Sequence, residues 1–132
     1  MSDYTKITID ELEDLAAARG AVGIEARSVR GPAGAEQTGA MVHKLSPGVR
    51  QPFGHVHEQA EELYLVLSGS GQVNLGDEVV ALGARDLIRI APHTPRCFEA
   101  GADGLELFAV GPHKEGDGRL FNGWWGGEVP EA

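Results

Sequence analysis

The segment from Pro47 to Gly69 reads PGVRQPFGHVHEQAEELYLVLSG and contains two histidines separated by a single residue. In a strand, residues i and i+2 project from one face about 7 Å apart, so His55 and His57 are expected to point the same way. After a short turn, Glu62 opens the next predicted strand, and an antiparallel neighbour brings its carboxylate across from the two imidazoles. Two imidazoles and one carboxylate are typical ligands of non-haem iron, and the same set binds zinc, nickel or manganese. The segment therefore predicts a mononuclear metal site made of His55, His57 and Glu62.

Around this segment, short apolar runs alternate with breaks that contain glycine. Glycine accounts for 19 of the 132 residues, about twice its usual share. Strands at spacings of about 8–12 residues predict an antiparallel sandwich or barrel, and hence an all-β fold class. The predicted strands span residues 22–29, 39–46, 51–56, 62–68, 71–75, 78–82, 86–90, 96–99 and 105–110.

One helix is predicted before the strands, near residues 9–19. Thr8 and Glu11 have the spacing of a capping box, and Ile9, Leu12 and Leu15 fall on one apolar stripe. After the last strand, residues 111–132 show no periodicity and are predicted to be irregular. We therefore expect a single domain over residues 1–132, with its barrel over residues 22–110.

The charge balance excludes several classes of partner. The chain has 11 basic and 20 acidic residues, a formal net charge of −9, whereas nucleic acids and anionic membranes attract basic surfaces.

The single cysteine cannot form an intramolecular disulfide. The N-terminal residues lack the features of a signal peptide, and no apolar run is long enough to span a bilayer. We expect a cytoplasmic protein without nucleic-acid or membrane partners.

The order of residues in the segment 47–69 resembles the first motif of the cupin superfamily. A second segment, GARDLIRIAPHTPRCF at residues 83–98, resembles the second cupin motif, which ends approximately in Pro-x-Gly-x-x-His. An isolated pair of histidines would more often be solvated loop residues, but the two motifs together favour a small bacterial single-domain cupin. The resemblance implies a double-stranded β-helix, or jelly-roll barrel, with one N-terminal helix, an internal ligand cavity and frequently a metal held by three histidines and one glutamate.

The second motif departs from the family at its last position. Alignment on Pro92 puts His93 at the usual glycine and Arg96 at the usual histidine. A guanidinium is always charged and is not a practical metal ligand. Strand alternation directs Arg96 and Phe98 inward and Cys97 outward. Because an unpaired buried charge is very costly, Arg96 needs a partner.

Three arrangements would provide one. In the first, a metal binds His55, His57 and Glu62, and Arg96 grips the carboxylate or phosphate of a bound molecule. In the second, no metal binds and Arg96 pairs with Glu62. In the third, His93 turns inward as a fourth metal ligand and Arg96 points to the rim of the barrel.

Further residues are candidates for lining the cavity. Alternation places the side chains of His43 and Tyr64 in the interior, so these two join Arg96 and Phe98 as candidate substrate-binding residues; a hydrogen-bonded core role is the alternative for both. The strand that begins at Glu62 carries leucines 63, 65 and 67 on its other face. Both faces of this strand must be covered, one by a second sheet and the other by the N-terminal helix or a second subunit. This pattern and the cupin resemblance favour a homodimer.

Two functions are compatible with these observations. The first is a small metal-binding cupin that acts on or binds a small anionic molecule, with dioxygenase, isomerase and lyase chemistry all compatible with the fold. The second is a metal-free, non-catalytic cupin that binds a small ligand and in which Arg96 pairs with Glu62. A purely oligomeric interaction protein would leave the histidines and Glu62 without a role.

Overall fold

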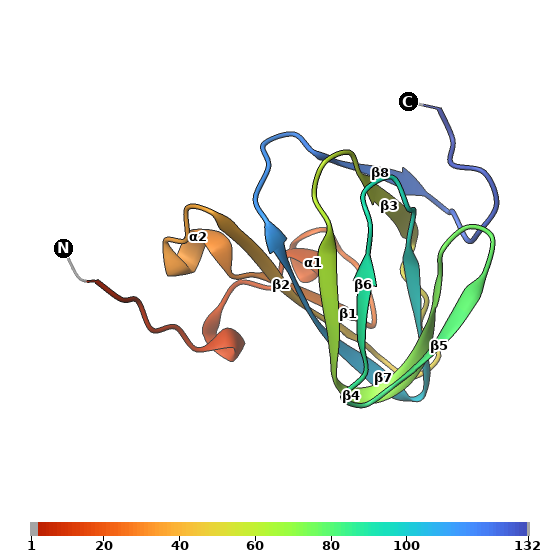
Figure 1. Ribbon diagram of the computed structural model, residues 1–132. Helices are drawn as coiled ribbons and strands as arrows, with labels where there is room; N and C mark the ends of the chain where they lie inside the picture. The colour runs from red at the N-terminus through yellow and green to blue at the C-terminus, as the bar shows by residue number, and fades with distance from the viewer. Residues whose placement is uncertain (1–2, 132) are drawn as a thin grey trace.

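The computed structural model of the chain describes residues 3–131 and consists mostly of antiparallel strands (Figure 1). The elements in this range are, in chain order, the 3-10 turn η1 (Ile9–Glu11), α1 (Leu15–Ala18), β1 (Ile24–Ser28), α2 (Arg30–Ala33), β2 (Thr38–Leu45), β3 (Phe53–His57), β4 (Glu62–Asn74), β5 (Val79–Gly83), β6 (Leu87–Ile90), β7 (Cys97–Pro112) and β8 (Gly118–Asn122). The strands form the jelly-roll barrel that the sequence predicts. Within residues 3–131, no helix is long and apolar enough to cross a membrane.

Two long strands, β4 and β7, form the centre of the barrel and pair with each other along most of their length. The first half of β4 also pairs with β6 and its second half with β5, while the end of β7 pairs with β2, which in turn pairs with β1. The remaining sheet joins β3 to β8, and a bridge between His55 and Arg96 connects it to the start of β7. The strand β3 therefore lies between β8 and the region of Arg96.

A bend allows β4 and β7 to take part in both layers of the barrel. The pairing register shifts between Val66 and Ser68 and again between Gly69 and Gly71. Gly69 has a φ of 80°, and a Cβ on this residue would lie 2.0 Å from the carbonyl oxygen of Gly104. The bend thus requires a residue without a side chain.

The core lies between the layers and follows the alternation of the strands. The register pairs Tyr64 with Ala109 and Val66 with Leu107, and all four side chains are buried. As the alternation predicts, Phe98 belongs to this core, whereas Cys97 packs on the opposite side of the strand, in a second cluster. The buried members of that second cluster are Val56, Cys97, Phe121 and Trp124.

The N-terminal helix is shorter than predicted. Residues 9–19 contain the turn η1 and the four-residue helix α1 instead of one continuous helix. A guanidinium nitrogen of Arg27 donates to the carbonyl of Leu12, and the carboxylate of Asp14 accepts from the backbone nitrogens of Ala16 and Ala26. These contacts with β1 occupy groups that a continuous helix would need, so α1 begins only after Asp14.

The prediction for the C-terminal residues was also incomplete. Residues 118–122 form β8, which pairs with all five residues of β3, although this region lacks periodicity in the sequence. Two predicted pairs of strands, 62–68 with 71–75 and 96–99 with 105–110, are continuous in the structure as β4 and β7. The stretch between the predicted strands 22–29 and 39–46 contains the short helix α2.

Candidate metal centre

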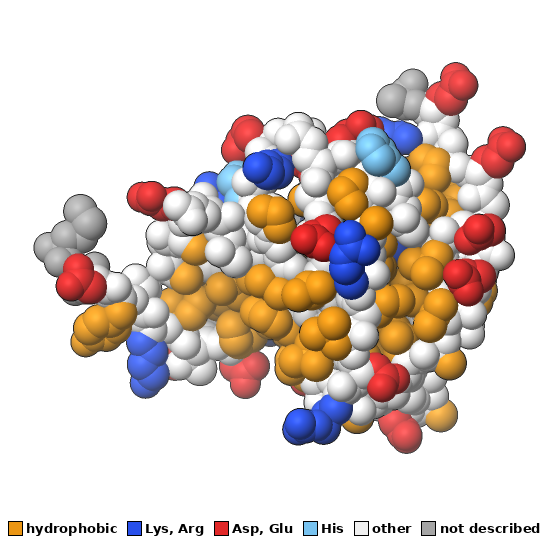
Figure 2. Space-filling view, viewed as in Figure 1, with side chains coloured by type: hydrophobic (Ala, Val, Ile, Leu, Met, Phe, Trp, Pro, Cys, Tyr) orange, Lys and Arg blue, Asp and Glu red, His pale blue; other side chains and the backbone are white. Residues whose placement is uncertain are grey.

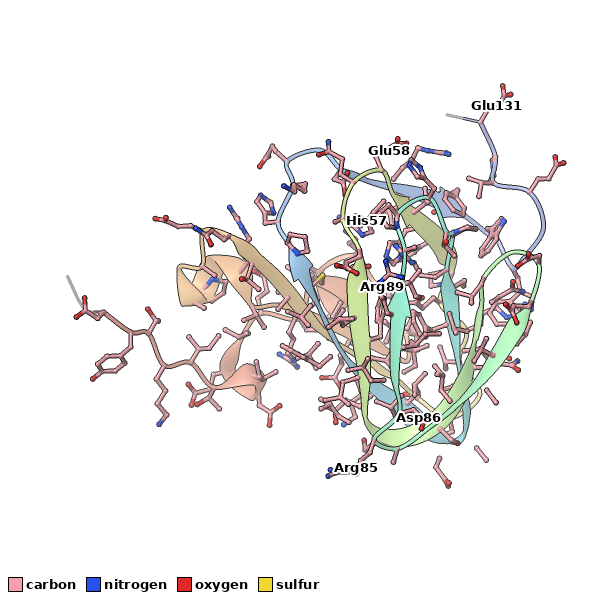
Figure 3. The ribbon with its side chains drawn as sticks, viewed as in Figure 1. His57, Glu58, Arg85, Asp86, Arg89 and Glu131 are labelled. Carbon is pink, nitrogen blue, oxygen red and sulfur yellow. The ribbon has the colours of Figure 1, made fainter. Side chains whose placement is uncertain are left out.

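The three predicted metal ligands meet near the turn between β3 and β4. His55 and His57 lie on β3 and Glu62 begins β4, and Figure 3 labels His57 near this end of the barrel. Nε2 of His55 lies 3.4 Å and Nε2 of His57 3.3 Å from Oε1 of Glu62. Two ligands at about 2.1 Å from one ion are about 3.4 Å apart at a tetrahedral angle, so this spacing fits a first-row divalent metal.

Solvent can reach the three ligands. Their side chains are 15%, 20% and 18% exposed for His55, His57 and Glu62 respectively. All three candidate ligand atoms lie within 4.8 Å of one another, and among residues 3–131 no other group of three such side chains converges in this way. The site is therefore partly open to solvent.

His57 is oriented by a carboxylate that the sequence analysis missed. Oδ2 of Asp117 lies 3.2 Å from Nδ1 of His57, and Asp117 also accepts hydrogen bonds from the backbone nitrogens of Gln59 and Ala60. Burial raises the pKa of Asp117, but these backbone hydrogen bonds outweigh it and lower the pKa overall. A proton on Nδ1 leaves the Nε2 lone pair facing Glu62, which is the tautomer that a metal requires.

Tyr64 holds the third ligand in place. Its hydroxyl donates a 2.6 Å hydrogen bond to Oε1 of Glu62 and lies 3.2 Å from Nε2 of His55. Its ring packs on Phe98 with the ring centres 4.7 Å apart. Burial and the neighbouring Glu62 raise the pKa of Tyr64 well above its ordinary value, so the hydroxyl remains a proton donor.

The protonation of the ligands suits metal binding. Burial raises the pKa of Glu62, but hydrogen bonds from His55, His57 and Tyr64 outweigh it and keep the residue a carboxylate. Burial lowers the pKa of His55, which favours the neutral imidazole. The hydrogen bond with Glu62 raises the pKa of His57, so a metal displaces a proton there more readily as the pH increases.

Arg96 is completely buried beside the same carboxylate. Its side chain is 0% exposed, and Nη1 lies 3.4 Å from Oε1 of Glu62, a contact that does not meet the geometry of a hydrogen bond. None of the three guanidinium nitrogens has a hydrogen-bond partner among the described residues. The site therefore combines three metal ligands with a buried cation whose donors are unused.

The two other candidate histidines, His43 and His93, lie in different environments: one faces the interior and the other is exposed. His43 pairs with the core residue Leu107 and so faces the interior, and burial, with a contribution from His55, lowers its pKa to about 4. His93 is exposed and lies outside the group of three ligands. Its backbone adopts a φ of 71° and its nitrogen donates to the carbonyl of His57, so the turn does not bring its side chain to the other two histidines.

A family profile described as "Cupin domain" matches residues 41–110, a segment that includes all three ligands and Arg96. This chain belongs to the cupin domain family. Among curated protein sequences, none matches the chain.

Solved structures have the same fold as this cupin. A cupin protein from Bacteroides fragilis is 27% identical, with a TM-score of 0.69 and 88% of each chain covered. The polyketide cyclase RemF from Streptomyces resistomycificus is 23% identical, with a TM-score of 0.72 over 95% of this chain and 87% of that one. Oxalate decarboxylase from Bacillus subtilis is 21% identical, with a TM-score of 0.74 over 92% of this cupin but only 32% of its own length.

Proposed function

We propose that this cupin binds a divalent transition metal through His55, His57 and Glu62 and holds a small anionic molecule beside it with Arg96. The observation that carries this proposal is the fully buried guanidinium, none of whose nitrogens has a hydrogen-bond partner among residues 3–131. Burial of polar groups without partners is costly. A carboxylate or phosphate group accepts two parallel hydrogen bonds from a guanidinium and would offset this cost.

The residues around the ligands support this proposal. Tyr64 and Asp117 fix the orientations of Glu62 and His57 through hydrogen bonds, and such supporting contacts are typical of metal sites. Iron, zinc, nickel and manganese all suit two imidazoles and a carboxylate. When bound, the ion would supply a Lewis acid beside the anion held by Arg96. Dioxygenase, isomerase and lyase chemistry are compatible with such a site, and the identity of the ion selects among them.

Elemental analysis of purified, tag-free protein tests the metal site. We expect about one transition metal ion per chain in the wild type and loss of that ion in the variant His57→Ala. Arg96→Ala is the matched variant, because it is expected to retain the metal and to lose affinity for small carboxylates. Absence of metal, even after reconstitution with iron, zinc, nickel and manganese, would refute the proposed site.

The contact between Arg96 and Glu62 favours a second candidate function, namely a metal-free cupin that binds a small ligand without catalysis. Nη1 of Arg96 lies 3.4 Å from Oε1 of Glu62, so the two opposite charges face each other inside the barrel. In this case Glu62→Gln should destabilise the protein by about 3–5 kcal/mol, since it leaves the buried guanidinium unpaired. Arg96→Met should cost less, since Glu62 keeps its hydrogen bond from Tyr64. Urea unfolding of the metal-free variants measures this cost, and small effects for both would contradict the structural pair.

We also propose that two copies of this cupin associate through the outer face of β4 and β6. Leu63, Leu67 and Leu87 are 36%, 44% and 58% exposed there, and Figure 2 shows apolar side chains in a band across this side of the molecule. Charges of both signs border the band, including the ion pair of Arg89 with Glu61; Figure 3, in the same view, labels Arg85, Asp86 and Arg89. A patch with both signs can match itself across a two-fold axis, which favours a second copy as its partner.

Sedimentation equilibrium tests this association. We expect the wild type to have twice the mass of one chain and Leu87→Glu to have the mass of one chain. The matched control is Leu120→Glu, since Leu120 is 53% exposed but lies on β8 in the other sheet. A wild type that sediments as a single chain would contradict the proposal.

A further inference from the structure

A single oxygen atom, Oε1 of Glu62, is shared by the proposed metal site and by Arg96. It lies 3.3 Å from Nε2 of His57, at a distance that suits metal coordination, and 3.4 Å from Nη1 of Arg96. Without a metal, this carboxylate is the anionic group that faces the guanidinium. The negative charge of Glu62 can therefore either bind the metal or compensate for the charge of Arg96.

A divalent ion at the three ligands would change the charge that surrounds Arg96. It would draw the negative charge of Glu62 toward itself and add positive charge to a region that already holds Arg96, whose side chain is 0% exposed. Like charges that water screens poorly repel each other strongly. Among the described residues, Arg96 has no hydrogen-bond partner that could compensate for the loss of Glu62.

We infer that Arg96 couples the two binding events, so that the metal binds tightly only together with a small anion at the guanidinium. This inference rests on the proposed metal site and states the condition under which a metal occupies it. The anion supplies Arg96 with the charge and the acceptors that it loses when Glu62 binds the ion. Arg96 thus acts as a regulatory cation beside the proposed metal ligands.

The coupling is reciprocal by thermodynamic linkage. If an anion raises the affinity for metal by a given factor, the metal raises the affinity for the anion by the same factor. In the metal-free protein an incoming anion must compete with Glu62 for the guanidinium, and in the metal-bound protein it does not. The two titrations must therefore give the same factor, so the reverse titration checks the first one without a variant.

Calorimetric titration of metal-free wild-type protein with Co²⁺ provides the test. One titration contains saturating sodium acetate and the other contains sodium perchlorate at the same ionic strength, because perchlorate coordinates metals poorly. We expect acetate to increase the affinity for Co²⁺ by about tenfold or more, within the range usual for coupled sites. The reverse titration, with acetate in the presence and absence of Co²⁺, should give the same factor.

The variants Arg96→Gln and Arg96→Lys identify the source of the coupling. Arg96→Gln removes the charge, so it should bind Co²⁺ tightly in perchlorate and show no effect of acetate. Arg96→Lys keeps the charge but not the planar pair of donors, so it should bind Co²⁺ as weakly as the wild type in perchlorate and respond less to acetate. The circular dichroism spectrum and the unfolding midpoint show whether each variant is folded.

The outcomes separate this inference from the proposed function. Tight binding of Co²⁺ that is indifferent to acetate would leave the metal site intact and overturn the coupling. Equal coupling in the wild type and in Arg96→Gln would also overturn the role of Arg96. Failure of the wild type to bind Co²⁺ under either condition would refute the proposed metal site and the coupling with it. Where both variants fail to fold, the wild-type titrations still overturn the coupling if acetate does not change the affinity for Co²⁺.

Discussion

Asp117 has a buried carboxylate that accepts hydrogen bonds from two backbone nitrogens and approaches His57. Asp117→Asn replaces one acceptor oxygen with a donor and thereby leaves at least one of these contacts unsatisfied. We expect the affinity for metal to fall by about 10–100-fold and the free energy of unfolding by about 1–3 kcal/mol. Metal titration and urea unfolding measure the two effects.

Glu115→Gln is the matched control for this substitution. Glu115 lies two residues before Asp117, and its side chain is 95% exposed beside His113. Removal of that charge should change neither metal affinity nor stability appreciably. An Asp117→Asn variant that binds metal as the wild type does would show that packing alone orients His57.

His43 makes the stability of the protein depend on pH. Its pKa is lowered from 6.5 to about 4, chiefly by burial, so between these values the unfolded chain binds a proton that the folded chain does not. Stability should therefore fall as the pH decreases through 6.5, with a loss of up to about 3 kcal/mol once the pH is below 4. Urea unfolding of metal-free protein at pH 7 and pH 5 measures the decline.

The decline of stability with pH in the variant His43→Asn, compared with that in the wild type, isolates the contribution of His43 from those of other titrating groups nearby. The pKa of His57 is raised by its hydrogen bond with Glu62, so His57 opposes the loss on acidification, whereas the pKa of His55 is lowered by burial, so His55 adds to the loss. The variant His43→Asn keeps His57 but loses the contribution of His43. Its free energy of unfolding should therefore decline less between pH 7 and pH 5 than that of the wild type. An unchanged decline in this variant would mean that His43 titrates normally.

The strand β3 is held against the C-terminal residues by close packing. A Cβ on Gly54 would lie 2.5 Å from the ring of Trp124 and 2.7 Å from that of Phe121. We expect Gly54→Ala to lower the free energy of unfolding by about 1–3 kcal/mol, because the two rings must move apart. Urea unfolding checks this value.

Gly31→Ala serves as the comparison for Gly54→Ala. Gly31 lies in α2, has a negative φ and has no atom within 4 Å of the added Cβ. Alanine is favoured over glycine in a helix, whereas a Cβ on the residue before Pro32 disfavours helical backbone, so the two effects oppose each other and stability should change by less than about 1 kcal/mol. A Gly54→Ala protein of equal stability would indicate that the C-terminal residues pack only loosely on β3.

The elements also show why some predictions succeeded. His55 and His57 could be placed on one face because strand periodicity fixes the direction of i and i+2 residues, and Glu62 follows them after a short turn. Arg96 and Phe98 could be directed inward for the same reason. These inferences depend on a few neighbouring residues, and local geometry determines them.

Predictions that depended on distant contacts were wrong or absent. Helix propensity favours residues 9–19, but the bonds from Arg27 and to Asp14 interrupt the helix. Asp117 has no motif around it, and its partner His57 is 60 residues away in the sequence. A single sequence contains no signal for such pairs, although the apolar residues Leu120 and Phe121 gave a weak local indication of β8.

A bound metal would link the two sheets of the protein. His55 and His57 belong to the sheet of β3 and β8, whereas Glu62 belongs to the sheet centred on β4 and β7. We expect metal at about 100 times its dissociation constant to stabilise the wild type by about 2.7 kcal/mol. Thermal unfolding in the presence and absence of Co²⁺ and acetate measures this shift.

His57→Ala is the control for the thermal experiment. It should unfold at the same temperature with and without the ion, because one ligand is missing. A similar increase in both proteins would place the ion elsewhere on the acidic surface, where the net charge of −9 attracts cations without a defined site.

The position of Asp117 has a consequence for the order in which the protein is made. The ribosome releases His55, His57 and Glu62 well before it adds Asp117 and β8, which follow β7. A nascent chain that ends before residue 117 has its three candidate ligands but lacks the group that orients His57 and the strand that pairs with β3. The site is therefore completed only after residue 117 has been added, and the mature geometry for capturing metal arises only once β8 can pair with β3.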